Sequence, residues 1–266
     1  VVLGRLEARH GRCAPLAGKS TLNRLEHGTA VVDRYRRIAH QPPLIERLFV
    51  DAFLDAHAEA PEEIVLDLDA TDDPLHGQQE GRFFHGYYDC HCYLPLYVFC
   101  GRHLLAAKLR RSNIDASAGA VEEVARIVAQ VRERWPTTSI VLRADSGFAR
   151  ESLMKWCEEN RVDYLFGLAR NNRLVEQIAA DLARAEQEAA RTEKPARRFA
   201  DFRWITKKSW SRSRRVVAKA EWLPGRGDNG ANPRFVVTSL EADAWEAQPL
   251  YEQLYCARGE MENRIK

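Results

Sequence analysis

The chain has 266 residues, of which 29% are charged and 45% hydrophobic, and its formal net charge at pH 7 is +2. This composition is typical of a globular protein and excludes a uniformly basic chain, so DNA binding would need locally clustered positive charge. No apolar run reaches the roughly 18 residues of a membrane span, no signal peptide is visible, and six cysteines in this length do not make a disulfide framework. We therefore expect a cytoplasmic protein with one large domain, or a core carrying an insertion.

The N-terminal region, residues 1–60, is predicted to be helical and polar. The stretch CAPLAGKST at 13–21 ends like a phosphate-binding loop but lacks the first glycine that such a loop needs, so we interpret its end as the start of a short helix. A second helix is predicted from Pro42 to Pro61. Since the sequence begins without methionine and stops inside a helical pattern, we expect both ends to be cut.

Residues 61–196 are predicted to form an α/β core. Apolar and polar residues alternate in a first strand at 62–73, EEIVLDLDATDD, and two further strands at 86–101 and 103–113 are predicted to form a hairpin around Gly101. The elements predicted next are a helix at 120–135, a strand at 139–148, a helix at 150–161, a strand at 163–170 and a helix at 171–191. This order predicts a mixed sheet flanked by helices.

The composition changes at residues 197–243, which lose helical periodicity around the turn-rich stretch LPGRGDNGANPR. We predict a separate small β-rich region here. The last segment, 244–266, is predicted to be a helix from about Ala247. On a regular helix one apolar stripe is formed by Leu250, Leu254, Ala257, Met261 and Ile265. The side chains of Tyr255, Arg258 and Glu262 would lie together beside that stripe.

Three carboxylates have positions that suggest chemistry. Asp69 lies at the end of the first strand, Asp145 lies at the end of the strand predicted at 139–148, and Glu262 lies on the last helix. Carboxylates at strand ends of an α/β sheet face the crevice where ligands bind, although each alone is also typical of a turn or a helix cap. Asp67 points to the same strand face as Asp69, so alternation does not choose between them.

These residues form motifs. The pattern Y-x2-R-x3-E, formed by Tyr255, Arg258 and Glu262, resembles the signature of DDE transposases of bacterial insertion sequences. DAT, which begins at Asp69, and ADSGF, around Asp145, resemble the first and second aspartate motifs of the same group. The resemblance covers roughly residues 60–266 and reaches weakly into LAGKSTLNRLE near the start. In that group the signature continues with six residues and a lysine, which would fall three positions beyond the last residue here.

The resemblance implies an RNase H-like fold with a β-rich insertion before the last catalytic helix. It implies that Asp69, Asp145 and Glu262 hold two Mg²⁺ or Mn²⁺ ions, with Asp145 bridging both, for cleavage and strand transfer of double-stranded DNA. Tyr255 and Arg258 would bind a DNA phosphate. It also favours Asp69 over Asp67 as the first aspartate. We expect a bacterial protein that acts as a homodimer on DNA at the nucleoid.

Positive charge is clustered in KKSWSRSRR at 207–215. Lys207, Lys208 and Arg212, close to Trp210, are predicted to contact the DNA backbone, and a solvated hairpin is the alternative interpretation. A zinc site is a weaker hypothesis, because the cysteines and histidines between 85 and 103 lack the spacing of a zinc finger. Two functional alternatives to a transposase stay open: an RNase H-like nuclease or resolvase, and a catalytically inactive DNA-binding remnant.

Overall fold

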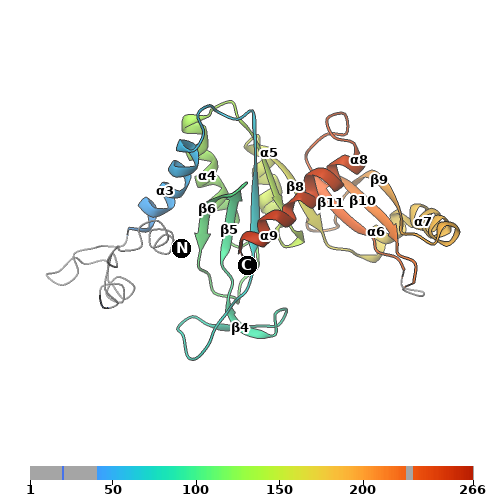
Figure 1. Cartoon of the computed structure of the whole chain (residues 1–266), viewed down its shortest axis with the longest axis horizontal. Helices are drawn as coiled ribbons and strands as arrows, with labels where there is room; N and C mark the ends of the chain where they lie inside the picture. Colours follow the sequence, from blue (N-terminus) through green and yellow to red (C-terminus); the bar gives the residue numbers. More distant parts are fainter. Residues whose placement is uncertain (1–19, 21–40, 226–229, 266) are drawn as a thin grey trace, which may run out of the picture. The chain divides into compact units, whose positions relative to one another are not determined.

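The computed structural model (Figure 1) describes residue 20 and residues 41–225 and 230–265, except for the side chain of Glu262. The chain divides into two units, 1–48 and 49–266. The loop-like stretch at 13–21 and the short helix predicted after it therefore lie outside the described residues, apart from Ser20.

Helix α3 (Pro42–Asp55) is shorter than the helix predicted to end at Pro61. Its last turn tightens at the end, where the backbone N–H of His57 bonds to the carbonyl of Leu54 only three residues earlier. Val50, Phe53 and Leu54 of this helix are buried in the second unit.

The second unit is built on one eight-stranded sheet with the order β6-β5-β1-β7-β8-β11-β10-β9. Its strands are β1 (Glu63–Ala70), β5 (Leu96–Cys100), β6 (His103–Lys108), β7 (Ser139–Ala144), β8 (Asp163–Leu168), β9 (Ala196–Trp204), β10 (Arg214–Trp222) and β11 (Arg234–Thr238). The central strands β1, β7 and β8 are parallel, and the pairs on both flanks are antiparallel. This confirms the predicted mixed α/β sheet and is consistent with an RNase H-like fold.

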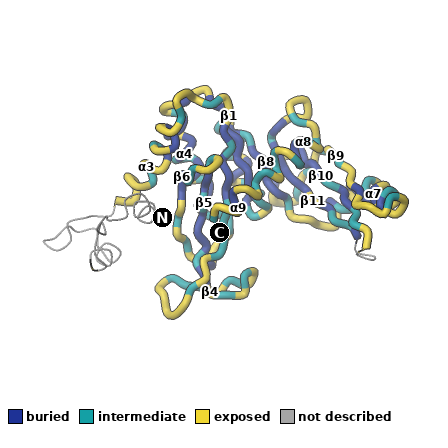
Figure 2. The backbone as a smooth tube through the Cα atoms, viewed as in Figure 1, coloured by how far each residue is buried: buried dark blue, intermediate teal, exposed yellow. Residues whose placement is uncertain are grey.

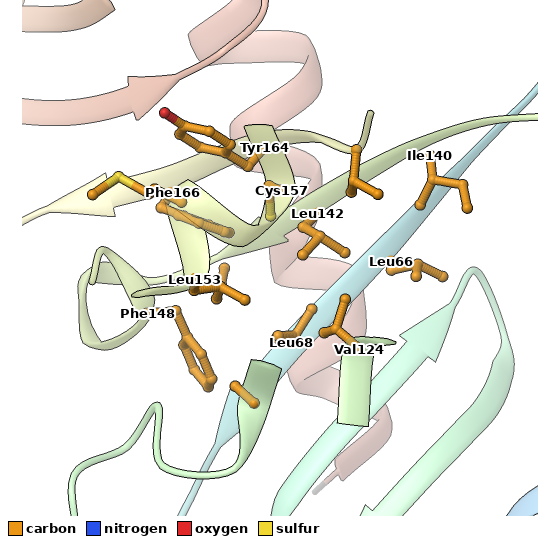
Figure 3. Close-up of a cluster of buried hydrophobic side chains, with 14 of the residues drawn as sticks. Leu66, Leu68, Val124, Ile140, Leu142, Phe148, Leu153, Cys157, Tyr164 and Phe166 are labelled. Carbon is orange, nitrogen blue, oxygen red and sulfur yellow. The ribbon is translucent and has the colours of Figure 1, made fainter. Parts of the chain in front are cut away.

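One face of the sheet packs against α4 (Ala120–Arg134) and α5 (Glu151–Glu159). As the alternation in the first strand predicts, Leu66 and Leu68 of β1 point into this core, where they lie with Val124 of α4 and Leu153 of α5 (Figure 3). Because successive side chains of a strand point to opposite faces, Asp67 and Asp69 point away from this core. The buried and exposed residues of each strand are seen along the backbone in Figure 2.

The long helix predicted at 171–191 is two helices, α6 (Asn172–Gln177) and α7 (Ala179–Thr192). They are separated at Ile178, which is fully buried and has a non-helical backbone (φ −110°, ψ 16°). Helix α7 packs beside β9 and β10 (Figure 1).

A second, three-stranded sheet with the order β2-β4-β3 lies between β1 and β5 in the chain. It consists of β2 (Asp73–Pro74), β3 (Phe83–His85) and β4 (Cys90–Tyr93). The prediction of one continuous strand at 86–101 was wrong. Residues 86–89 form a turn, and the strand is divided at Pro95, which has no N–H to donate to a ladder.

The segment predicted as a β-rich insertion contains β9, β10 and β11. These strands extend the core sheet, because β11 pairs antiparallel with β8 from Phe235 opposite Leu168 to Thr238 opposite Leu165. The boundaries of the predicted domains, at 61, 197 and 244, stay predictions.

The last helical segment is irregular, unlike the regular helix that was predicted. It runs through α8 (Ala247–Pro249), the π-helical turn η3 (Leu250–Tyr255), the 3₁₀ turn η4 (Cys256–Arg258) and α9 (Gly259–Ile265). The π turn buries Leu250 and Tyr251 on the sheet face opposite α4, against Leu165 and Val217. None of the helices that the structure describes is long and apolar enough to span a bilayer.

Candidate active site

Asp69 and Asp145 lie at the same end of two neighbouring parallel strands. Leu68 of β1 is in register with Ala144 of β7. Asp69 and Asp145, the residues that follow them, therefore lie at the same height along the two strands. Neighbouring strands are about 4.8 Å apart, which brings the two carboxylates close together. Both line one cleft of about 650 Å³. The structure therefore brings together two of the three predicted catalytic carboxylates.

Asp145 has a defined local geometry. It caps the short helical turn η1 (Ser146–Phe148), with its Oδ1 accepting a hydrogen bond of 2.8 Å from the N–H of Gly147. This bond orients the carboxylate. A Cβ atom at position 147 would lie 3.0 Å from Oδ1, so glycine suits this tight turn.

Asp67 has a different environment from Asp69. Its two carboxylate oxygens accept hydrogen bonds of 2.6 and 2.8 Å from Nε and Nη2 of Arg143 on β7, and the side chains are only 5% and 9% exposed. Nη1 of the same arginine donates to the carbonyl of Leu254 in η3. Asp67 thus belongs to a buried ion pair that ties β1, β7 and the last helical segment together, whereas Asp69 lines the cleft.

The last helical segment places one polar side chain beside each aspartate. Nη1 of Arg258 lies 3.8 Å from Oδ1 of Asp69. Tyr255 lines a second cleft, of about 310 Å³, together with Asp145 and Ser146. Burial raises the pKa of the Tyr255 hydroxyl; Arg258 partly offsets this effect, and the negative charge of Asp145 adds to it. The hydroxyl therefore stays protonated at neutral pH and is a hydrogen-bond donor.

Glu262 follows Arg258 by one turn on α9, and its side chain lies outside the described residues. Ile265 of the same helix lines the cleft of Asp69 and Asp145, so α9 borders that cleft. Among the side chains that are described, no three histidine, cysteine, aspartate or glutamate residues form a metal-binding group. The two adjacent aspartates nevertheless fit a hard cation, because Mg²⁺ prefers carboxylate oxygens.

The hairpin of β3 and β4 forms another wall of the cleft, with His85 at the end of β3 and Tyr87 and Tyr88 in the turn. The hydroxyl of Tyr88 donates a hydrogen bond of 3.3 Å to the carbonyl of Ala70, the residue after Asp69. Burial and the nearby carboxylates of Asp72 and Asp69 raise the pKa of Tyr88 to about 12, so this donor is retained at neutral pH. This wall was not predicted, although the aromatic stretch GYYD was a possible signal for it in the sequence.

The predicted basic cluster, 207–215, lies in the connection between β9 and β10 and in the first two residues of β10. Lys207 and Lys208 are exposed, whereas Arg212 lies 3.1 Å from a carboxylate oxygen of Glu158. Trp210 is only 8% exposed and belongs to the core, and the guanidinium of Arg214 lies over its ring. The tryptophan is therefore a packing residue and not a surface for bases.

The requirement for glycine at position 167 of β8 was not predicted from the sequence. A Cβ atom there would lie 2.5 Å from the hydroxyl oxygen of Tyr255 and 2.9 Å from the backbone nitrogen of Ser146. Both neighbours come from segments distant in the chain, so local sequence gives no signal for this requirement. The absence of a side chain allows Tyr255 to approach the backbone beside Asp145.

Comparison with known proteins identifies the family of the chain. A family model described as the transposase DDE domain, group 1, matches residues 1–266. A search of curated proteins gave no match. Proteins with this domain are transposases, which act on DNA and recombine it, and in general they cleave DNA with the help of divalent metal ions. The match extends over the whole chain. The chain belongs to the DDE transposases.

Proposed function

We propose that this transposase cleaves double-stranded DNA at the ends of a bacterial insertion sequence and transfers the cleaved strand, in a reaction that depends on Mg²⁺ or Mn²⁺. The observation that carries the proposal is the pair of aspartates, Asp69 and Asp145, at the ends of adjacent parallel strands in one cleft. Family membership supports a DNA substrate, and the carboxylate oxygens suit these hard cations.

In this proposal, Asp69, Asp145 and Glu262 hold two divalent ions, which would supply charge stabilisation to the transferred phosphoryl group. Gly147 orients Asp145 through its N–H, so this carboxylate needs little rearrangement when it binds a cation. The ion pair of Asp67 and Arg143 has a positioning role, because it anchors the backbone of Leu254 next to the residues that face the cleft.

Tyr255 and Arg258 would bind the DNA phosphate. Arg258 offers a guanidinium fork and Tyr255 a protonated hydroxyl, both of which donate to phosphate oxygens. Their positions beside Asp69 and Asp145 support this role, because a phosphate held there lies next to both carboxylates. Arg258 would exchange its long contact with Asp69 for a phosphate oxygen when the carboxylate binds a cation.

Lys207, Lys208 and Arg212 would contact the DNA backbone farther from the cleft. Their connection is held near the start of α5, where the hydroxyl of Ser211 donates to Glu151, and α5 follows η1 and Asp145 closely in the chain. Arg212 would give up its partner Glu158 on binding DNA. We propose a homodimer on DNA, so that one copy acts at each end of the element.

The experiment compares Asp145→Asn and Asp69→Asn with the wild type. Asparagine at 145 keeps an acceptor for the N–H of Gly147 while it removes the charge that a cation needs. We expect both variants to lose Mg²⁺-dependent cleavage of DNA carrying the element's end, to lose Mn²⁺ binding in calorimetry, and to keep DNA binding.

Asp55→Asn is the matched control, because this aspartate is 69% exposed and pairs with Arg134 outside the cleft. It should cleave like the wild type. Unchanged cleavage by Asp145→Asn would refute the assignment of the site. A wild-type protein that binds DNA but cleaves it with neither Mg²⁺ nor Mn²⁺ would instead indicate a catalytically inactive remnant.

A further inference from the structure

A hairpin presents a tyrosine at the edge of the cleft. Strands β3 and β4 pair with His85 opposite Cys90, so residues 86–89 form its four-residue turn. The turn is fixed by a backbone hydrogen bond from Tyr88 to His85 and by the left-handed conformation of Asp89 (φ 52°). Strand β4 also pairs with β2, which follows β1 closely, and the small sheet around β4 is seen in Figure 1. The turn is therefore tied to the strand that carries Asp69.

Tyr87, in this turn, is exposed and also borders the cleft. Its side chain is 84% exposed, which leaves most of a large apolar ring in water. It also lines the same cleft as Asp69 and Asp145. An exposed aromatic ring at a site that takes a charged substrate has an unused stacking face.

The ring of Tyr87 is supported from one side. The ring of Tyr88 contacts it in an edge-to-face arrangement, with centroids 5.0 Å apart and planes at 87°. Tyr88 is itself held by its hydrogen bond to the carbonyl of Ala70 and by the ring of His85, whose centroid lies 4.9 Å away. These contacts hold Tyr87 in a defined position relative to the end of β1, although most of its ring is exposed to solvent.

The substrate offers a matching surface. A DNA phosphate held at Asp69 and Asp145 joins two nucleotides, so the base of each lies close to it. Aromatic side chains bind such bases by stacking on their faces. Inside a duplex both faces of a base are covered by its neighbours. We propose that Tyr87 stacks on an unpaired nucleobase next to the phosphate that is cleaved; this inference rests on the function proposed above.

The test measures DNA affinity with Ca²⁺ in place of Mg²⁺. The probe is a duplex with a single-stranded flank whose first unpaired base is 2-aminopurine, and a blunt duplex of the same sequence is its comparison. We expect Tyr87→Ala to weaken binding of the flanked probe by about 5- to 150-fold and to abolish the quenching of 2-aminopurine. Tyr87→Phe should bind like the wild type, because stacking needs the ring and not the hydroxyl.

Phe84→Ala is the matched control. Phe84 is an aromatic residue of the same hairpin, is 55% exposed, and is not among the residues of the cleft. It should leave both the affinity and the quenching unchanged. Binding of the blunt duplex should be equal for Tyr87→Ala and the wild type.

Three results would overturn the proposal. The first is full affinity of Tyr87→Ala for the flanked probe, and the second is an equal loss of affinity on both probes, which would indicate stacking on a terminal base pair. The third is a loss of affinity in Tyr87→Phe as large as in Tyr87→Ala. These results are distinct from failure of the proposed function, which would appear as a wild-type protein without metal-dependent cleavage.

Discussion

The hydroxyl oxygen of Tyr255 lies 2.5 Å from the place that a Cβ atom on Gly167 would occupy. Any side chain at position 167 must therefore displace either the tyrosine or the strand. Since Tyr255 shares a cleft with Asp145, this close approach links the packing of β8 to the geometry of the proposed phosphate site.

The first prediction is that Gly167→Ala lowers both stability and cleavage. The added methyl group would also lie 2.9 Å from the backbone nitrogen of Ser146, so we expect a loss of about 1–3 kcal/mol in the free energy of unfolding. DNA cleavage should fall more than DNA binding. Thermal denaturation and cleavage assays on the same preparation measure the two effects.

Two variants sharpen this prediction. Combining Gly167→Ala with Tyr255→Phe removes one of the two clashes and should recover part of the lost stability. Gly259→Ala is the control, because no atom lies within 4 Å of its Cβ position and its backbone is helical (φ −58°). A Gly167→Ala protein with wild-type stability and cleavage would show that Tyr255 does not need its present position.

The second prediction separates Asp67 from Asp69. Asp67→Asn leaves the buried guanidinium of Arg143 without its full partner, and we expect it to cost about 3–5 kcal/mol in stability. Asp69→Asn weakens a 3.8 Å contact with Arg258 and should cost less than Asp67→Asn, while it abolishes cleavage. Urea denaturation of the two proteins provides the comparison, and equal losses would contradict the assignment.

The difference between these two aspartates also shows which part of the site can be predicted from the sequence and which part cannot. The alternation in β1 and the strand ends at Asp69 and Asp145 are local patterns, so they predict a carboxylate site without a structure. Asp67 lies on the same strand face as Asp69, and its partner Arg143 is 76 residues away. Family resemblance favoured Asp69, and in the structure Asp67 belongs to a buried ion pair whereas Asp69 lines the cleft.

Other features could not be predicted because they depend on packing or on irregular backbone. A helical wheel assumes a constant turn, whereas η3 and η4 contain π and 3₁₀ turns, so angles predicted along 250–258 are inexact. The prediction for the basic cluster at 207–215 rested on its charge and on Trp210 among the basic residues. Burial of Trp210 and pairing of Arg214 with Glu151 and Glu158 show that part of it stabilises the core.

The third prediction concerns acid stability near the cleft. Burial alone would raise the pKa of Asp115, but hydrogen bonds from Arg150 and Ser117 prevail and lower it from 3.8 to about 2. A carboxyl group whose pKa is lowered by folding stabilises the protein above its unfolded pKa, and this contribution is lost as the pH falls through the folded value.

We therefore expect Asp115→Asn to be less stable than the wild type at pH 7, by about 1 kcal/mol or less because the pair is half exposed. The difference should stay constant down to about pH 4 and shrink between pH 4 and pH 2. Urea denaturation over a pH series measures it. In a second variant, Arg150→Gln, NMR titration should find the pKa of Asp115 closer to 3.8; a pKa that stays near 2 would contradict the role of Arg150.

The last prediction tests the basic connection between β9 and β10. Lys207 and Lys208 are exposed, whereas Arg212 is paired with Glu158. If both lysines contact phosphates, Lys207→Ala combined with Lys208→Ala should reduce the slope of log affinity against log salt concentration by about 2, since each phosphate contact releases about one counterion. Fluorescence anisotropy with duplex DNA over a salt series gives this slope.

The matched control is Arg191→Ala combined with Lys194→Ala, which removes the same charge from exposed positions at the end of α7. Its slope should equal that of the wild type. If both double variants lower the slope equally, the effect comes from the net charge of the protein, and the connection between β9 and β10 is not a DNA contact. An effect confined to Lys207 and Lys208, with the folded stability unchanged, places this connection on the DNA-binding surface.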